Sequence, residues 1–266
     1  MTTATGLPEL PGLNSQAEVE RRAGLGQITW AGPLIVLLGR SFLMIAVQAL
    51  VAVCYLVRGH PSPWNAAAPW WTVYGTLVDI GCLALMAKFT RAEGIRLRDL
   101  VGKMRLRWGH DFFLGAGCFV LFVFLFSAPG WLATKLGFSI SQAAMYPGLF
   151  SERRLPLWAV IYSLSIWWLI WSPTEEMTYN GYALPRLQAL TGRKWMAVLM
   201  VGFWWALQHS FFPLIFDWTY VLWRFLFFLP GVIGVTLLYL GIRRLPPLIL
   251  AHWPMDIAAV FYTLRF

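Results

Sequence analysis

Charged residues are scarce in this chain. Asp, Glu, Lys and Arg make up 12% of its 266 residues, and 59% are hydrophobic. A soluble domain carries about 25% charged residues, so this composition excludes an ordinary soluble protein. Several apolar runs have the length of roughly 20 residues that crosses a bilayer. The sequence therefore predicts an all-α fold, a polytopic transmembrane bundle of about seven or eight spans.

Cysteine is also rare, and its pattern excludes two kinds of site. Cys54, Cys82 and Cys118 all fall inside apolar runs, and their spacing is unpaired. An odd number without paired spacing predicts neither a disulfide framework nor a zinc knuckle. We expect these side chains to pack as small apolar groups.

The apolar runs divide the chain into three parts. Residues 1–28 are polar and lack the basic start, short apolar core and cleavage pattern of a signal peptide. The second part, 29–140, holds N-terminal membrane helices and a basic amphipathic loop at 91–111. The third part, 155–262, is expected to be the functional membrane core.

Seven spans are expected from the runs themselves. Their approximate limits are 33–57, 69–89, 112–133, 155–190 with an interruption at Pro173, 195–212, 220–240 and 246–262. In the sixth span, Gly231 and Gly234 would allow a neighbouring helix to approach closely.

The net charge of +9 does not indicate a nucleic-acid partner, because the basic residues are divided among short loops. The loop at 91–111 mixes basic and apolar residues, which favours contact with the lipid bilayer surface. With the N-terminus inside, most Lys and Arg of the connections lie on the inner side. The positive-inside rule therefore predicts a cytoplasmic N-terminus.

Some charged residues lie within the apolar runs. Arg40 lies near the start of the first span, so we expect it to be an interfacial anchor. Asp79 lies deeper in the second span and is expected to be a buried acid that faces other helices. Arg224 lies within the sixth span.

Two adjacent carboxylates, Glu175 and Glu176, follow the long apolar run 155–171. Ionised carboxylates are costly in hydrocarbon, so membrane acids usually face a polar interior and indicate a functional site. On a helix, Glu176 shares a face with Asn180, and Glu175 shares one with Tyr179. The two glutamates point about 100° apart, so each can have a different role.

Two histidines lie in later spans with informative neighbours. Trp205 precedes His209 by one helical turn, and Asp256 follows His252 by one turn. We expect these residues to form one polar site with the glutamates. The predicted catalytic set is Glu175, Glu176, His209, His252 and Asp256, supported by Asn180, Tyr179 and Trp205.

This set resembles the CPBP family of intramembrane proteases, related to CAAX prenyl endopeptidases and bacteriocin self-immunity proteins. The family carries Glu-Glu-x-x-x-Arg, Phe-x-x-x-His and His-x-x-x-Asn or Asp on separate helices. Here the motifs correspond to 175–180, 205–209 and 252–256, in the same order. Asn180 replaces the family arginine and Trp205 the family phenylalanine. Arg224 is a candidate to supply the missing charge to Glu176, but an interfacial or interhelical role unconnected to the site is favoured.

The resemblance implies an endopeptidase that acts on a membrane-associated protein or peptide, in a bacterial inner membrane. Glu175 would be the general base for a water that His209 also holds, with no metal or other cofactor. His252 would donate a hydrogen bond to the developing oxyanion. Asp256 would be protonated or would orient His252. A prenylated CAAX tail is the family's best-known target, but no feature of the sequence indicates that a lipid is recognised.

Three alternatives stay open. Asn180 favours a weak or inactive relative that acts by binding, as an immunity or scaffold protein. His209, His252 and Glu175 could instead hold zinc with one open position, although no His-Glu-x-x-His helix is present. A transporter coupled to buried acids is disfavoured by the absence of a detectable repeat.

Overall fold

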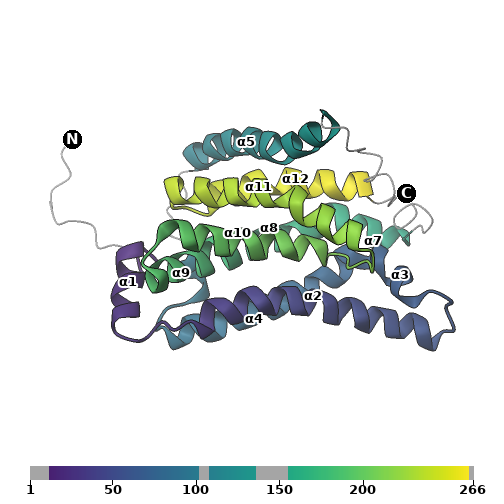
Figure 1. Ribbon diagram of the computed structural model, residues 1–266, viewed down its shortest axis with the longest axis horizontal. Helices are drawn as coiled ribbons and strands as arrows, with labels where there is room; N and C mark the ends of the chain where they lie inside the picture. The colour runs from purple at the N-terminus through teal and green to yellow at the C-terminus, as the bar shows by residue number, and fades with distance from the viewer. Residues whose placement is uncertain (1–11, 102–107, 136–154, 264–266) are drawn as a thin grey trace.

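The computed structural model describes residues 12–101, 108–135 and 155–263. Within these ranges helices are the only regular elements. The long helices lie side by side along the long axis of the molecule (Figure 1). The predicted all-α fold is therefore confirmed.

The N-terminal half contributes a surface helix and a helical pair. Helix α1 (Gln16–Gly24) precedes α2 (Ala31–Val57), and the short α3 (Pro63–Ala67) and η1 (Ala68–Trp70) lead into α4 (Trp71–Ala92). Helix α4 returns alongside α2, and together they form one edge of the bundle (Figure 1). The 3-10 turn η2 (Leu97–Val101) follows.

The opposite edge is formed by α5 (Trp108–Lys135), which packs against α12 (Pro246–Thr263) and α11 (Trp218–Ile242). Helix α10 (Lys194–Ser210) packs against α11 and completes the middle of the bundle. This arrangement places α8, α10 and α12 between the two edges (Figure 1).

The helix that carries the paired glutamates is irregular. Its successive parts are α7 (Leu157–Tyr162), η4 (Ser163–Trp167), α8 (Trp168–Glu176), η5 (Met177–Ala183) and α9 (Leu184–Thr191). Here η4 and η5 are π-helical, and the residues at all four junctions keep right-handed helical backbone angles. The expected interruption at Pro173 is therefore wrong, because the helix continues through it and loosens on either side.

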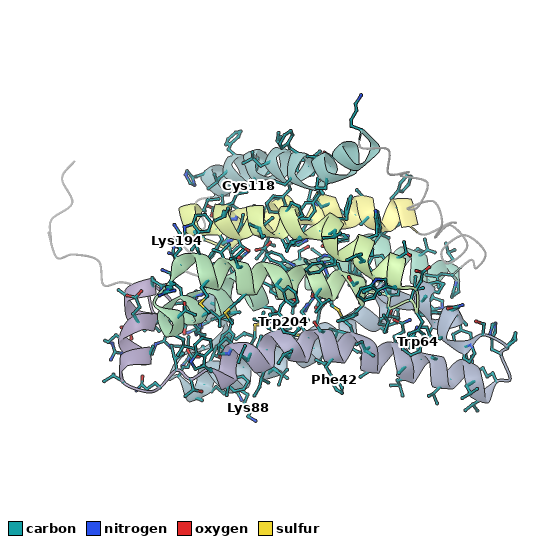
Figure 2. The ribbon with its side chains drawn as sticks, in the orientation of Figure 1. Phe42, Trp64, Lys88, Cys118, Lys194 and Trp204 are labelled. Atoms are coloured by element: carbon teal, nitrogen blue, oxygen red, sulfur yellow. The ribbon has the colours of Figure 1, made fainter. Side chains whose placement is uncertain are left out.

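Four helical segments are long and apolar enough to cross a membrane, judged over the described residues alone. They are Ala31–Val57, Pro63–Ala92, Gly109–Pro129 and Trp218–Ile242. Large hydrophobic side chains such as Phe42, Phe113 and Trp218 are exposed on these helices, and Phe42 points outward from α2 (Figure 2). The chain is a multi-pass membrane protein. The larger predicted number of spans stays a prediction.

Close helix contacts occur where the sequence predicts them. A side chain at Gly231 would meet the Phe126 ring of α5, and one at Gly234 would meet Leu125 of α5. The three cysteines are unpaired. Cys82 and Cys118 are buried, whereas Cys54 is exposed.

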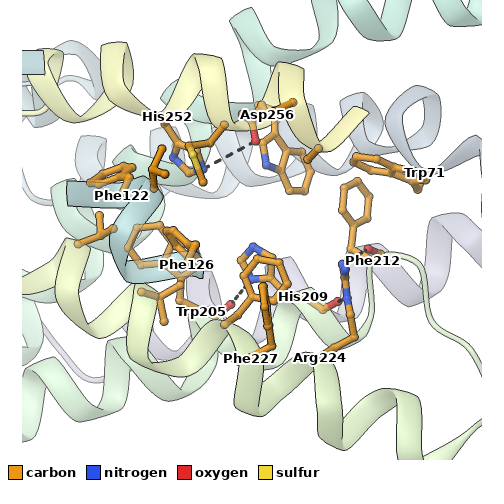
Figure 3. A pocket seen from close by; sticks show the side chains of 18 of the residues that line it. Trp71, Phe122, Phe126, Trp205, His209, Phe212, Arg224, Phe227, His252 and Asp256 are labelled. Atoms are coloured by element: carbon orange, nitrogen blue, oxygen red, sulfur yellow. Dashed lines mark hydrogen bonds and ion pairs between the residues drawn. The ribbon is translucent and has the colours of Figure 1, made fainter. Parts of the chain in front are cut away.

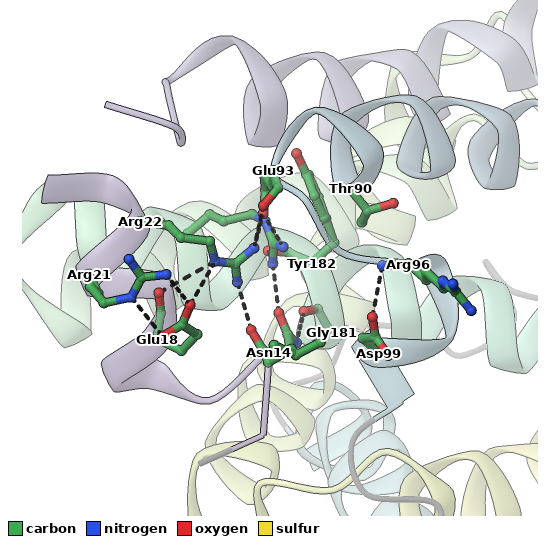
Figure 4. A network of polar contacts seen from close by, with 12 residues as sticks. Asn14, Glu18, Arg21, Arg22, Thr90, Glu93, Arg96, Asp99, Gly181 and Tyr182 are labelled. Carbon is green, nitrogen blue, oxygen red and sulfur yellow. Dashed lines mark hydrogen bonds and ion pairs between the residues drawn. The ribbon is translucent and has the colours of Figure 1, made fainter. Parts of the chain in front are cut away.

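A polar network ties the N-terminal segment to the bundle (Figure 4). Glu93, at the end of α4, pairs with Arg22 of α1 at 3.1 Å and with Arg186 of α9 at 2.6 Å. Asn14 donates to the Gly181 carbonyl at 2.8 Å. All three charged side chains are buried, so this network joins α1, α4 and α9 inside the protein.

The expected surface segment at 91–111 is partly turned inward. Ile95 and Leu100 are buried against Val36 and Tyr182, so these two apolar side chains contact protein rather than lipid. Residues 102–107 of the same segment lie outside the described part of the chain.

Candidate active site

Glu175 and Glu176 form the end of α8 and are both fully buried. They face different helices, because neighbouring helical residues point about 100° apart. Glu175 faces Trp205 and Gln208 of α10, while Glu176 faces His252 of α12. One irregular helix therefore presents a carboxylate to each of its two neighbours.

The two oxygens of Glu175 have different surroundings. Oε1 accepts a hydrogen bond from Trp205 Nε1 at 2.7 Å and another from Gln208 Nε2. Oε2 has no hydrogen-bond partner among the described residues and lies 3.6 Å from His252 Nε2. A carboxylate with one oxygen anchored and one free can accept a proton at a defined position.

His209 presents one ring nitrogen to this carboxylate. Its Nδ1 lies 2.8 Å from the Trp205 carbonyl oxygen, which can only accept, so we assign the proton to Nδ1. Nε2 then carries a lone pair and lies 3.9 Å from Glu175 Oε1. The ring stacks on Phe228 with centroids 3.8 Å apart, which holds its orientation.

Glu176 obtains its partners from side chains other than the one predicted. Asn180 Nδ2 donates to Oε2 at 2.8 Å, and His252 Nδ1 lies 3.2 Å from Oε1. Arg224 donates instead to the backbone oxygens of His209 and Phe212, at 2.9 and 3.0 Å. Arg224 therefore does not supply the missing charge to Glu176, because its guanidinium holds the end of α10 in the interhelical role that the sequence favoured.

Asp256 also faces His252. Its Oδ2 accepts a hydrogen bond from Ser172 Oγ, and its Oδ1 lies 3.8 Å from His252 Nε2. His252 thus lies close to the carboxyl groups of Glu175, Glu176 and Asp256. Both of its ring nitrogens face oxygen atoms, so both can donate hydrogen bonds.

Arg40 is the clearest error of the sequence analysis. It is fully buried, pairs with Asp79 at 3.0 Å and donates to Gln208 Oε1 at 2.7 Å. It does not reach the interface as an anchor, because α2 packs that face against α4 and α10. Asp79 is a buried acid between helices, as predicted.

Gln208 was missed as a site residue. Its oxygen accepts from Arg40 and from Tyr179 OH at 2.9 Å, and its nitrogen donates to Glu175. Tyr179 also stacks on Trp205, with ring centroids 4.8 Å apart. The available signal was a polar residue within an apolar run, directly before a candidate histidine.

A cavity of about 520 Å³ opens beside these residues (Figure 3). Its walls are mainly aromatic, with Phe122 and Phe126 on one side and Trp71 and Phe212 on another. The titratable or charged side chains of its lining are those of His209, His252, Asp256 and Arg224. An apolar cavity with a few convergent polar groups is the usual form of a binding site.

No group of three or more His, Cys, Asp or Glu side chains within the described ranges is arranged to hold a metal ion. The nearest equivalent of the zinc alternative is the pair of histidines on either side of Glu175. We therefore retain zinc as an outcome for metal removal to test.

Comparison with known families gives a match over the segment that carries the predicted site residues. Residues 156–258 match the model of the family described as type II CAAX prenyl endopeptidase, Rce1-like. No curated protein and no solved structure matches the chain. The matched segment includes every predicted site residue, whereas Arg40 and Asp79 lie before it. Over residues 156–258 the chain is therefore similar to the Rce1-like family of CAAX-type membrane proteases, in agreement with the resemblance carried by its three motifs.

Proposed function

We propose that this protein is an intramembrane endopeptidase that hydrolyses a membrane-associated protein or peptide with water activated by Glu175. The observation that carries the proposal is the anchoring of Glu175 Oε1, which leaves Oε2 free beside His252. The family match to a membrane protease supports the same class of reaction.

The reaction follows from these positions. Water hydrogen-bonded to the lone pair of His209 Nε2 would give its proton to Glu175 Oε2, the oxygen left free, as the water oxygen attacks the scissile carbonyl carbon. The carbonyl π electrons move onto oxygen, where His252 Nε2–H donates to the oxyanion. When the carbon–nitrogen bond breaks, the leaving nitrogen takes the proton from Glu175. Asp256 would orient His252 throughout.

Location and orientation belong to the same proposal. The exposed apolar helices and the aromatic cavity fit a substrate that enters from the bilayer. The distribution of Lys and Arg among the connections favours a cytoplasmic N-terminus, and we place the protein in a bacterial inner membrane. The aromatic cavity admits an apolar segment, and we leave open whether that segment is prenylated.

The decisive experiment compares protein termini in membranes from cells that make the wild type or Glu175→Gln at equal levels. Glutamine keeps the shape of the side chain but cannot accept the proton, so we expect cleavage to fall by at least about 100-fold. Glu20→Gln, at an exposed position of α1, is the matched control and should cleave normally. Termini that require Glu175 would identify both the activity and its substrate.

Identical termini in wild type and Glu175→Gln would contradict the proposal and favour a binding role as an immunity or scaffold protein. Chelation of the purified protein separates the two chemistries. Activity unchanged after chelation supports glutamate catalysis alone, whereas activity lost on chelation and restored by Zn²⁺ would overturn the metal-free mechanism in favour of the zinc alternative.

A further inference from the structure

Arg40 lies outside the family-matched segment but inside the bundle, next to the candidate catalytic centre. Its side chain is 0% exposed, although it comes from α2 at the edge of the molecule. It donates through Nε to Gln208 and through one terminal nitrogen to Asp79, and its guanidinium lies 4.3 Å over the Trp171 ring. The N-terminal helices therefore contribute a buried cation to the site.

The contact with Arg40 sets the direction of the Gln208 carboxamide. A guanidinium can only donate, so the group that faces Arg40 must be the amide oxygen. Tyr179 OH donates to the same oxygen. The amide nitrogen is then directed at Glu175, to which it donates. A flipped amide would put an oxygen against the Glu175 carboxylate and an NH2 group against the Arg40 cation.

This orientation decides which oxygen of Glu175 is available. With Gln208 and Trp205 both donating to Oε1, that oxygen is held, and Oε2 is left towards His252. Loss of the Gln208 donor would release one of the two anchors of the carboxylate. The side chain could then rotate and exchange its oxygens.

Stability alone gives no reason for an arginine here. A buried ion pair contributes little net stability, because the loss of hydration offsets the attraction, and apolar pairs of similar volume often do as well. This pair is also incompletely satisfied within the described structure, since Arg40 Nη2 and Asp79 Oδ2 have no hydrogen-bond partner there. The directional donation to Gln208 is what an apolar pair could not provide.

We propose that Arg40, held by Asp79, is a positioning residue that acts through Gln208 to keep the Glu175 carboxylate in its productive orientation. This inference rests on the proposed protease function. It also assigns the N-terminal helical pair a part in catalysis, since α2 supplies Arg40 and α4 supplies Asp79.

The first test replaces both charges together, as Arg40→Gln with Asp79→Asn, so that no unpaired charge is buried. Rates are measured on a synthetic peptide that spans the cleavage site found in the comparison of termini. We expect kcat to fall at least about tenfold, because small displacements of a catalytic group are costly, while KM changes less than about twofold. Arg40→Lys retains a donor for Gln208 and should recover part of kcat.

A double-mutant cycle separates positioning from simple packing. Gln208→Leu removes the amide through which Arg40 acts. If Arg40 works through Gln208, adding the Arg40→Gln and Asp79→Asn changes to Gln208→Leu lowers kcat no further. Losses that multiply would show that Arg40 acts independently, and would overturn the inference.

Arg186→Gln provides the matched control. Arg186 is also fully buried and also pairs with a carboxylate, Glu93, but it contacts none of the predicted catalytic residues. We expect it to lower thermal stability and leave kcat of the folded protein unchanged. Should the charge-free variant fail to fold, Arg40→Lys alone keeps a cation opposite Asp79 but changes the donor geometry at Gln208, and a kcat equal to wild type would then contradict the inference.

The outcomes separate this inference from the function on which it rests. Cleavage that survives Glu175→Gln would contradict the proposed protease function. Cleavage that requires Glu175 but keeps full kcat in the Arg40→Gln, Asp79→Asn variant would contradict only the positioning role of Arg40.

Discussion

At the scale of single residues, Glu176 pairs with Asn180, which stands where the motif of the similar family has arginine. Asn180 is fully buried and donates to Glu176, whose other oxygen faces His252. Asn180 is a neutral donor that satisfies one oxygen of Glu176, so His252 is the ionisable partner of this carboxyl group. The substitution therefore increases the dependence of Glu176 on the histidine.

Asn180→Ala is expected to lower the free energy of unfolding by about 1.5–3 kcal/mol, because a hydrogen bond to a buried carboxyl group is lost. Cleavage should fall with it, as Glu176 no longer holds His252 in one orientation. Thermal unfolding in detergent and cleavage of the substrate peptide measure the two effects.

Asn180→Asp is the companion variant, with the same shape but an acceptor in place of the donor. An additional carboxyl group beside Glu176 and His252 should make it less stable than Asn180→Ala. Equal stability of Asn180→Asp and the wild type would contradict the assigned direction of this hydrogen bond.

At the scale of elements, the glutamate helix, which runs from α7 to α9 and carries Glu175 and Glu176, contains two π-helical segments, η4 and η5. The π-helical segment η5 begins directly after Glu176 and contains Tyr179 and Asn180. Such turns occur often at functional sites, where the extra residue changes the direction of the following side chains. Here η5 carries Tyr179, whose hydroxyl donates to Gln208 of α10.

The glycines of α11 set the separation between α11 and α5, which both line the cavity. A Cβ at Gly234 would lie 2.6 and 2.9 Å from the two methyl carbons of Leu125. Gly234→Leu should therefore force the helices apart and lower the free energy of unfolding by about 1–3 kcal/mol.

Gly117→Leu on the exposed face of α5 is the control for added bulk, since nothing lies within 4 Å of its Cβ position. Thermal unfolding in detergent compares the two variants. A Gly234→Leu protein as stable as Gly117→Leu would show that the helices do not pack as described.

At the scale of the whole molecule, the N-terminal segment is held against the end of the glutamate helix. Glu93 is the common partner of Arg22 and Arg186, and Asn14 binds the carbonyl of Gly181. Gly181 lies in the same π-helical segment as Asn180. The docking of α1 thus stabilises the region that follows the paired glutamates.

Glu93→Gln removes the carboxylate that the buried Arg22 and Arg186 share, and leaves Arg22 only Glu18 at 3.8 Å. We therefore expect it to lower the free energy of unfolding by about 3–5 kcal/mol. Denaturation of the full chain in detergent measures this change. Glu18→Gln is the control, because Glu18 pairs with the exposed Arg21, which lowers the pKa of Glu18 through a hydrogen bond. Equal effects of the two changes would contradict the role of Glu93 as the buried link.

The sequence by itself determined the all-α membrane class and the similarity of residues 156–258 to a protease family. Both depend on properties that are local along the chain, namely the length of apolar runs and the spacing within each motif. The placement of Glu176 and Asn180 on one helical face is of the same kind, because four residues span about one helical turn.

Only the tertiary structure decided which polar groups meet across the bundle. Arg40 and Gln208 are 168 positions apart, and no periodicity within α2 indicates that α10 will supply the acceptor. The same reason explains why Arg224 holds the end of α10 rather than Glu176. Local pattern predicts that a membrane-buried charge needs a partner, but helix packing selects the partner.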